Sequence, residues 1–341
     1  MLPCLLFALL PTAAARPALA AAARSLSRRV LGASDVLRAG PAPGVAVVTD
    51  FGAVGDGVTD NTAAFAAAIA SLSTSPTGSG GMVYVPSGQF SFSSTVPCST
   101  AGAASICLTR GVSLVGTFET VPSHNVGQHG SPPINGSILC PRAGRGNESG
   151  PPFIAMPEDS SMRGFSVWYP EQLGTQAPLP YPYTVFMQGN NVAVQDVEFL
   201  NSWNAVSAVG AHRHYLARLQ GQPVNIGIFV DQTYDIGRIE DVHWNPWFSS
   251  DPSYIAHQTT FGVGFLIART DWEYARKLRA VQHHCQRAAA KAQRARTLTP
   301  APPPPQPLKP SRSSTHLCLP CPWATTLWSR PRVPAMVTLS A

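Results

Sequence analysis

Four short segments in the middle of the chain repeat one pattern, and this repeat constrains the fold more than any other feature. They are MRGFSV (162–167), VQDVEF (194–199), LARLQG (216–221) and IEDVHW (239–244). Each has an apolar residue at its first and fourth positions, and the fourth positions are Phe165, Val197, Leu219 and Val242, separated by 32, 22 and 23 residues. A second apolar stretch follows in two repeats, AVSAVG (205–210) and IGIFVD (226–231), and we align the two at an offset of 21.

A repeat near 22 residues, made of short strands and polar turns, predicts an all-β solenoid, a parallel β-helix. No single turn of such a chain can bury its apolar face, but stacking at about 4.8 Å per rung buries a column of equivalent residues. A leucine-rich repeat would need an asparagine-centred consensus that is absent here, and a β-sandwich would lack the regular column. A composition of 12% charged residues with 28 Gly and 33 Pro also favours an all-β body.

The stretch VVTDFGAVGDGVTDNTAAFAAAIAS (47–71) places a turn cluster directly before a helical pattern. Phe65, Ile69 and Leu72 have helical spacing, and Asp60 stands where an N-cap carboxylate would accept amide hydrogen bonds. The open end of a solenoid exposes unpaired backbone and needs a cap. We therefore expect an N-terminal capping helix, with structural rather than catalytic roles for Asp56 and Asp60.

Composition divides the chain into four parts. Residues 1–23 resemble a secretory signal, residues 24–44 a leader, residues 45–272 the β-helix body, and residues 273–341 a basic, proline-rich tail that is disordered or helical. The sequence RSLSRRV (24–30) leaves an organellar transit peptide as the alternative to export. The change of composition after the body suggests that the natural continuation of the domain is missing.

The charge of the body excludes one class of partner. Residues 45–272 contain 8 Arg and no Lys against 16 Asp and Glu, so the body is acidic, and the formal +6 comes mainly from the tail and the N-terminus. Phosphate attraction needs basic groups on the folded surface, so we expect no nucleic-acid partner. No segment is long enough to span a bilayer. We expect a secreted monomer without a membrane anchor.

Cysteine usage fits an oxidising compartment. Cys98 and Cys107 flank a short Gly/Ala/Ser loop and could form a local disulfide. Cys140 would then be unpaired or bonded elsewhere.

The motif DFGAVGDGVTDNTAAFAAAI, followed by GGMVYVPSGQF, resembles the opening of the pectate-lyase-like superfamily, which includes rhamnogalacturonases and epimerases. The resemblance covers residues 45–270 and implies a right-handed parallel β-helix that acts on polysaccharide. The polygalacturonase branch carries an N-T-D segment, an adjacent Asp pair, a G-H-G and an R-I-K, none of which occurs in the rung region. The reaction therefore stays open, because one fold can host several functions.

The aligned repeats place polar residues in two further columns. The third position holds Gly164, Asp196, Arg218 and Asp241, and the fifth holds Ser166, Glu198, Gln220 and His243. Carboxylates two rungs apart would be separated by about 9–10 Å, at the upper edge of the spacing for inverting hydrolysis. We therefore take Asp196 and Asp241 as catalytic candidates, with Glu198 and His243 as an acid–base pair. The alternative for Asp196, Arg218 and Asp241 is a purely ionic ladder.

A carboxylate cluster follows the second apolar stretch. VDQTYDIGRIED contains Asp231 and Asp235, which could ligate calcium and so help a lyase acidify a uronate proton, with Arg218 as base or charge stabiliser. Turn-forming aspartates explain the same residues, so we otherwise expect no cofactor.

Aromatic residues supply candidates for sugar contact. Rings in a shallow groove can stack on sugar faces, and Trp203, Trp247 and Tyr169 are the candidates, while Trp244 is expected in the core. Together these features predict a glycoside hydrolase or polysaccharide lyase homologue that acts on pectin-like glycans. A non-catalytic carbohydrate-binding or adhesive β-helix, or an inactive truncated member, is the alternative.

Overall fold

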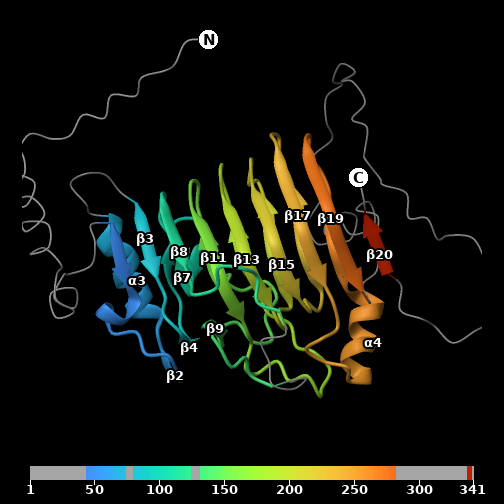
Figure 1. The fold of residues 1–341 in the computed structure, drawn as a ribbon, viewed down its shortest axis with the longest axis horizontal. Helices are drawn as coiled ribbons and strands as arrows, with labels where there is room; N and C mark the ends of the chain where they lie inside the picture. Colours follow the sequence, from blue (N-terminus) through green and yellow to red (C-terminus); the bar gives the residue numbers. More distant parts are fainter. Residues whose placement is uncertain (1–43, 74–79, 124–130, 282–335, 340–341) are drawn as a thin grey trace, which may run out of the picture. The chain divides into compact units, whose positions relative to one another are not determined.

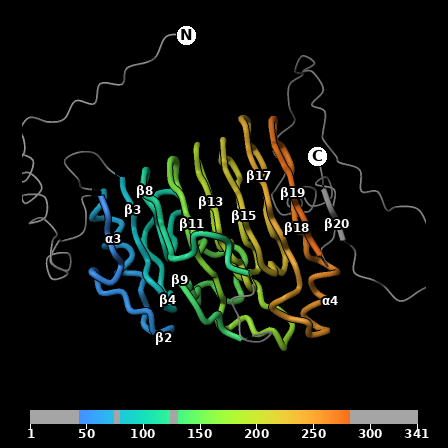
Figure 2. The backbone as a smooth tube through the Cα atoms, in the orientation of Figure 1, coloured from blue at the N-terminus to red at the C-terminus, as the bar shows by residue number. Residues whose placement is uncertain are grey.

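The computed structural model describes residues 44–73, 80–123 and 131–281, and the backbone of 336–339. The signal-like segment, the leader and most of the tail lie outside these residues. The described body is built from two parallel sheets, of 12 and 6 strands. In Figures 1 and 2 the strands of the larger sheet lie side by side, and their order runs from the blue N-terminal end to the orange C-terminal end. The expected parallel β-helix is confirmed.

The larger sheet follows two lines of strands. The main line comprises β1 (Val45–Val47), β3 (Gly81–Tyr84), β8 (Val112–Val115), β11 (Ser161–Val167), β13 (Ala193–Phe199), β15 (Tyr215–Gly221), β17 (Gly237–Trp244) and β19 (Glu273–Val281), and the side line comprises β2 (Asp56–Asp60), β4 (Gly88–Phe92) and β9 (Ser137–Pro141). The second sheet comprises β7 (Ile106–Cys107), β10 (Ile154–Met156), β12 (Tyr183–Met187), β14 (Asn204–Val209), β16 (Ile226–Asp231) and β18 (Val263–Ile267). Each later rung thus contributes one strand to each sheet. The antiparallel exceptions are the β5–β6 pair (Val96–Cys98 and Gly102–Ala104) and β20 (Met336–Leu339) on the edge of β19.

The internal column predicted from the repeat is confirmed. Phe165 pairs with Val197, Val197 with Leu219, and Leu219 with Val242, and all four side chains are buried. The alignment of the second stretch is wrong by one residue, because Val206 pairs with Ile228 at an offset of 22. Ala205 and Val206 are both apolar and both buried, so the pattern of this strand does not fix its own register.

A left-handed residue at the third position of each segment explains why apolar residues recur three apart. Side chains of a regular strand alternate, so first and fourth positions would face opposite sides. Instead Asp196, Arg218 and Asp241 have φ of 54°, 51° and 57°, and Gly164 has 84°. The register pairs the residues before and after this position on neighbouring strands, but it contains no pair at the position itself. The bend therefore turns both apolar positions inward at every rung.

The capping helix is confirmed as α3 (Thr62–Ser73), which follows a 3-10 turn, η1 (Val48–Phe51), and buries Phe65, Ile69 and Leu72. One Asp60 oxygen accepts hydrogen bonds from the Thr62 amide (3.1 Å) and the Ser93 amide (3.2 Å). Burial would raise the pKa of Asp60, but the hydrogen bonds from Ser94, Thr62 and Ser93 outweigh it and lower the pKa to about 2. Asp60 thus ties the start of the helix to the second rung.

Asp56 closes a tight turn in front of the cap. Its carboxylate accepts the amides of Val58 and Thr59 and the Thr59 hydroxyl. The Thr59 hydroxyl, followed by these amides, lowers the pKa of Asp56 to about 2. The structural roles expected for Asp56 and Asp60 agree with this geometry.

The body continues past the boundary expected at residue 272. Strand β19 pairs with β17 over its whole length, with Ala275 under Ile239 and Leu278 under Val242. Residues 276–281, which we assigned to a basic helical run, are therefore the next rung. The helix α4 (Pro252–Phe261) lies in the connection between β17 and β18 and begins at Asp251, whose carboxylate accepts the Ser253 amide.

The predicted disulfide between Cys98 and Cys107 is present, with the two Cα atoms 5.6 Å apart. Cys140 is a buried free thiol, and burial raises its pKa to about 12, so it is an unreactive core residue. Among the described residues, no helix is long and apolar enough to cross a membrane.

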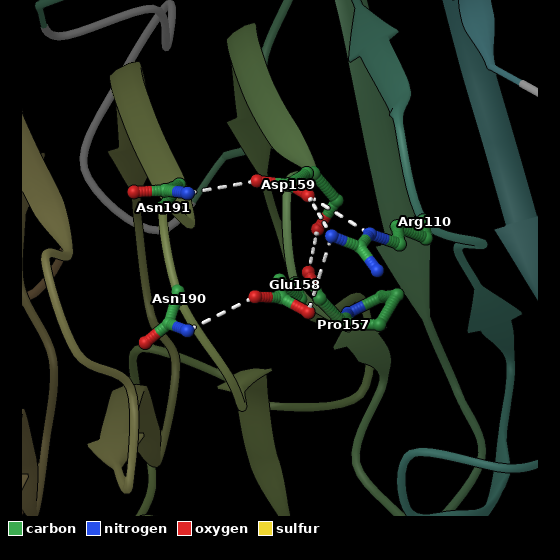
Figure 3. A network of polar contacts seen from close by, with 7 residues as sticks. Arg110, Pro157, Glu158, Asp159, Asn190 and Asn191 are labelled. Carbon is green, nitrogen blue, oxygen red and sulfur yellow. Dashed lines mark hydrogen bonds and ion pairs between the residues drawn. The ribbon is translucent and has the colours of Figure 1, made fainter.

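A polar network holds a second corner of the early rungs (Figure 3). Arg110 Nε donates to Asp159 Oδ2 (2.9 Å), and Asn191 Nδ2 donates to Asp159 Oδ1 (2.8 Å). Asn190 Nδ2 donates to Glu158 Oε1 (3.0 Å). The Asn191 bond, followed by that of Arg110, lowers the pKa of Asp159. Each carboxylate is bound by side chains from neighbouring rungs, so this network fastens the corner.

Candidate functional site

Asp196 and Arg218, two of the predicted catalytic residues, bind each other. Arg218 donates from Nε to Asp196 Oδ1 (2.6 Å) and from Nη2 to Asp196 Oδ2 (2.8 Å), and the Asp196 side chain is only 6% exposed. The Asp196 hydrogen bond raises the pKa of Arg218 further above its already high value. A protonated guanidinium paired in this way favours the charge-stabilising role over the base role, and both roles of Arg218 stay predictions.

Asp241 does not join this pair. It is exposed on β17, and no ion pair links it to Arg218 among the residues that the structure describes. The expected three-residue ionic ladder is therefore a buried bidentate pair plus a separate surface carboxylate. Since the Asp196 carboxylate is bound on both oxygens, it is poorly placed to work with Asp241 as an acid–base couple.

Glu198 and His243 lie in the column that the repeat predicted. Glu198 pairs with Gln220, and Gln220 with His243, so the two candidates are two rungs apart. Glu198 is 2% exposed and accepts the Ser166 hydroxyl hydrogen bond (2.9 Å), while His243 is half-buried. The shared column is confirmed, and an acid–base role for it stays a prediction.

The two predicted calcium ligands face arginines instead of each other. Asp231 accepts both Nε (2.8 Å) and Nη2 (2.7 Å) of Arg269, and Asp235 accepts Nε of Arg213 (2.5 Å). Within the described residues, no group of three or more His, Cys, Asp or Glu could hold a metal ion. Ion pairing with arginine therefore accounts for both carboxylates.

Two of the three predicted sugar-contacting aromatics are core residues. Trp203 is 6% exposed and packs on the His257 ring at 4.9 Å, and Tyr169 is 1% exposed with its hydroxyl 2.8 Å from Thr184 Oγ1. Both stand in loops whose aromatic residues fold inward to fill the space between the sheets, so the prediction for them is wrong. Trp247 is 47% exposed, as its prediction requires.

A surface that the sequence reasoning missed lies on the last three rungs. Tyr215 of β15, Arg238 of β17 and Tyr274 of β19 pair in register, and they flank the inward residues Leu216, Ile239 and Ala275. These three outward residues form what we call the Tyr–Arg–Tyr column. Arg238 is exposed and Tyr274 is 56% exposed. A cation thus stands between two aromatic rings along the axis of the solenoid.

The adjoining column fixes Tyr215 in place. The Tyr215 hydroxyl donates to Glu240 Oε1, and Arg276 of β19 binds the other oxygen of the same carboxylate. The Tyr215 hydrogen bond lowers the pKa of Glu240, and the same bond raises that of Tyr215. Glu240 is therefore an ionised anchor that binds Tyr215 and Arg276, while Arg238 of the Tyr–Arg–Tyr column is exposed.

Charge on the last two rungs differs from that of the body as a whole. Strands β17 and β19 carry Arg238, Arg276, Lys277 and Arg279 against Glu240, Asp241 and the buried Glu273. Trp272, directly before β19, is 63% exposed and adds a further ring at this end. A locally basic, aromatic face on an acidic body fits an anionic ligand that presents apolar faces to the rings.

A depression at the other end of the solenoid is the contrasting candidate. It is open to solvent, has a volume of about 470 Å³, and is lined by Gly55, Asp56, Ser87, Gly88, Gln89, Ile134, Gly136 and Ile138. Its one ionisable lining residue, Asp56, is used by the turn described above. We therefore place the candidate site on the last three rungs.

Comparison with known proteins agrees with the fold. A family model described as rhamnogalacturonase A/epimerase, pectate lyase-like, matches residues 45–130, and this match covers the cap and first rungs of the solenoid described above. Residues 45–130 of the chain are therefore similar to this pectate-lyase-like family. None of the curated proteins matches it. Because the family match ends at residue 130, it assigns no role to the Tyr–Arg–Tyr column.

Solved structures with detectable likeness include the ORF18 protein of Geobacillus virus E2, at 15% identity and a TM-score of 0.33, covering 59% of this chain and 42% of that one. The A-module of the Azotobacter vinelandii mannuronan C-5 epimerase AlgE4 matches at 17% identity and a TM-score of 0.28, covering 57% and 58%. PfbA, a surface adhesin of Streptococcus pneumoniae, matches at 14% identity and a TM-score of 0.30, covering 68% and 57%. The chain thus spans about two fifths to three fifths of the length of these proteins.

A sequence signal for the missed face does exist. Ala275 and Leu278 have the same three-residue spacing as Ile239 and Val242, so the repeat extends into YARKLRA (274–280). The many cations of this segment hid the spacing, because they resembled a solvated tail.

Proposed function

We propose that the protein binds an acidic, pectin-like polysaccharide along the Tyr–Arg–Tyr column. The observation that carries the proposal is the in-register placement of Tyr215, Arg238 and Tyr274 on successive rungs. Rungs repeat at about 4.8 Å, so a chain lying along the axis meets a ring, a guanidinium and a ring in turn. Tyrosine rings offer apolar faces for sugar rings, and a guanidinium binds carboxylate oxygens in bidentate geometry.

The uronate preference follows from Arg238. A neutral glycan would leave the Arg238 guanidinium hydrated and would be bound through the tyrosine rings alone. A uronate would add a charge-assisted hydrogen bond between its carboxylate and this guanidinium. The family that matches residues 45–130 bears the name of a polysaccharide-degrading enzyme, which supports a glycan ligand over other anions. Glu198 and His243 are the residues that we propose for hydrolase or lyase chemistry, and the alternative is a binding protein without turnover.

The setting that we propose is extracellular, with the protein acting as a monomer. The apolar first 23 residues support export, and the Cys98–Cys107 bridge supports an oxidising compartment. Pectin-like glycans occur outside cells, so the proposed ligand and the proposed location agree.

Removing the guanidinium of Arg238 is expected to weaken binding of oligogalacturonate about tenfold, because a hydrogen bond to a charged group contributes roughly 1.5 kcal/mol or more. Isothermal titration calorimetry of Arg238→Gln against the wild type measures this loss. Arg163→Gln is the matched control, since Arg163 is an exposed arginine on β11, two strands before β15 in the same sheet. Equal affinities for wild type and Arg238→Gln would overturn the proposal, as would stronger binding to a neutral galactan.

The same preparations separate an enzyme from a binder. Release of reducing ends or unsaturated products from a panel of pectins would show that the protein is an enzyme. Loss of this activity in Glu198→Gln or His243→Gln would show that the column of Glu198 and His243 carries the reaction. Binding without product by the wild type supports the non-catalytic alternative.

A further inference from the structure

A buried ionisable pair crosses three rungs at the start of strands β15, β17 and β19. His214 is fully buried and the Glu273 side chain is 7% exposed, and His214 Nε2 lies 3.0 Å from Glu273 Oε1. Gly237 pairs with Glu273, and Tyr215, which follows His214, pairs with Arg238, so Gly237 lies between the two. The pair therefore joins β19 to a residue two rungs away, across the backbone of the intervening strand.

Only glycine can occupy the middle position of this arrangement. A Cβ atom added to Gly237 would lie 2.2 Å from Glu273 Oε2 and 2.5 Å from His214 Cε1. Any side chain at residue 237 would thus separate the two partners. The column His214–Gly237–Glu273, which we call the latch, forms because its central member has no side chain.

Hydrogen-bond stoichiometry sets the number of protons on the latch. His214 Nδ1 lies 2.8 Å from the Ala211 carbonyl oxygen, which can only accept, so Nδ1 carries a hydrogen. Glu273 Oε2 accepts from the Thr270 hydroxyl (3.4 Å), so the carboxylate acts as an acceptor on that side. A hydrogen bond between Nε2 and Oε1 then needs a second proton, on the ring or on the carboxyl. Without it, a ring lone pair faces a carboxylate in a buried site.

Other charged groups around the latch are engaged elsewhere or point to solvent. Arg213 pairs with Asp235, and Arg269 with Asp231, at the same corner. Arg238, whose amide donates to the His214 carbonyl, directs its exposed side chain outward, and Asp271 is exposed. The Thr270 hydroxyl is the remaining polar contact of Glu273. No charged side chain among the described contacts of His214 and Glu273 would therefore compensate for loss of the shared proton.

Tyr274 and Arg276 follow Glu273 on the same strand, so the latch bears directly on the proposed binding face. We propose that His214 and Glu273 are positioning residues that hold β19, and with it half of the glycan-binding face, only while the pair retains its shared proton. The proposal rests on the proposed function for its link to glycan affinity. Binding would then weaken as the pH rises and the pair loses this shared proton.

Amide hydrogen exchange of the full chain without glycan tests the latch by itself. After correction for intrinsic rates, we expect protection of residues 273–281, relative to 193–199, to fall about tenfold as the pH is raised and the pair loses its shared proton. Glu273→Gln should abolish this dependence while keeping protection, because its amide donates to a neutral Nε2 without any shared proton. Asp241→Asn, an exposed carboxylate on β17, is the matched control and should keep the wild-type dependence. A change below about threefold in the wild type, or a wild-type dependence in Glu273→Gln, contradicts the latch.

A second readout needs no variant and so does not depend on folding of Glu273→Gln. In ¹⁵N-histidine spectra of the wild type, His214 Nε2 should be either protonated or hydrogen-bonded to a carboxyl proton at acidic pH, and exchange protection of β19 should fall as this hydrogen bond is lost. A His214 ring that stays singly protonated throughout, with β19 equally protected, would overturn the proposal. Oligogalacturonate affinity is then measured over the same pH range. If the latch titrates as expected and no glycan binds, the proposed function fails while the latch stands.

Discussion

Replacing Trp244 with alanine is expected to lower the free energy of unfolding by about 3–5 kcal/mol, the largest effect of any single substitution discussed here. Trp244 is fully buried at the end of β17 and packs on Phe199, two rungs earlier in the same sheet, and on Phe265 of β18, in the other sheet. Its Nε1 donates to the Gly264 carbonyl oxygen (3.1 Å). Truncation therefore opens a cavity between the sheets and leaves a buried carbonyl without this donor.

The midpoint of urea unfolding, followed by far-ultraviolet circular dichroism, measures the loss. Trp272→Ala is the control, because this residue is 63% exposed, and its removal should change the unfolding free energy by less than about 1 kcal/mol. If the two alanine variants were equally stable, Trp244 could not join the two sheets as described.

Arg218→Met is expected to destabilise the protein by about 2–3 kcal/mol, because it leaves the Asp196 carboxylate buried without its bidentate partner. The value lies below that of a fully buried pair, since the Arg218 side chain is 39% exposed. Methionine keeps most of the apolar stem, so the change isolates the guanidinium. Arg163→Met, at an exposed position of the same sheet, should be within about 0.5 kcal/mol of the wild type.

Adding Asp196→Asn to Arg218→Met should restore part of the lost stability, because the double variant no longer buries an unpaired charge. A double-mutant cycle in urea measures this coupling. Purely additive effects of the two substitutions would mean that the pair contributes no coupling, and Asp196 would return as a catalytic candidate.

The repeat predicted the internal column because solenoid stacking forces equivalent residues of each rung to coincide. Phe165, Val197, Leu219 and Val242 therefore followed from spacing alone. The second sheet was harder, since Ala205 and Val206 offer two apolar faces and the register slipped by one. Only the neighbouring rungs, which place Val206 between Val185 and Ile228, remove that ambiguity.

Site residues were less predictable than the fold, for reasons that differ from residue to residue. Rung spacing brought Asp196 next to Arg218, but spacing could not show that the two would bind each other on both carboxylate oxygens. Loop positions suggested exposure for Trp203 and Tyr169, whereas their rings fold inward and fill the core. Whether an aromatic ring in a loop faces inward depends on packing between sheets, which a single repeat does not encode.

The missed strand β19 shows how charge can hide a rung. Its inward residues are Ala275, Leu278 and Ala280, of which only Leu278 is a large apolar residue. Its outward residues include Tyr274, Arg276 and Arg279. Outward residues of a terminal rung are free to be basic, so composition points to a tail and only the spacing points to a strand. The same outward residues complete the proposed binding face.

The most direct test of that face is an exchange footprint of the full chain in the presence and absence of oligogalacturonate. We expect added protection in the segments that contain Tyr215, Arg238 and Tyr274, and unchanged exchange in β3 and β8 at the opposite end. Protection confined to the early rungs, or to the depression around Asp56 and Gln89, would show that anionic glycans use another surface and would contradict the account.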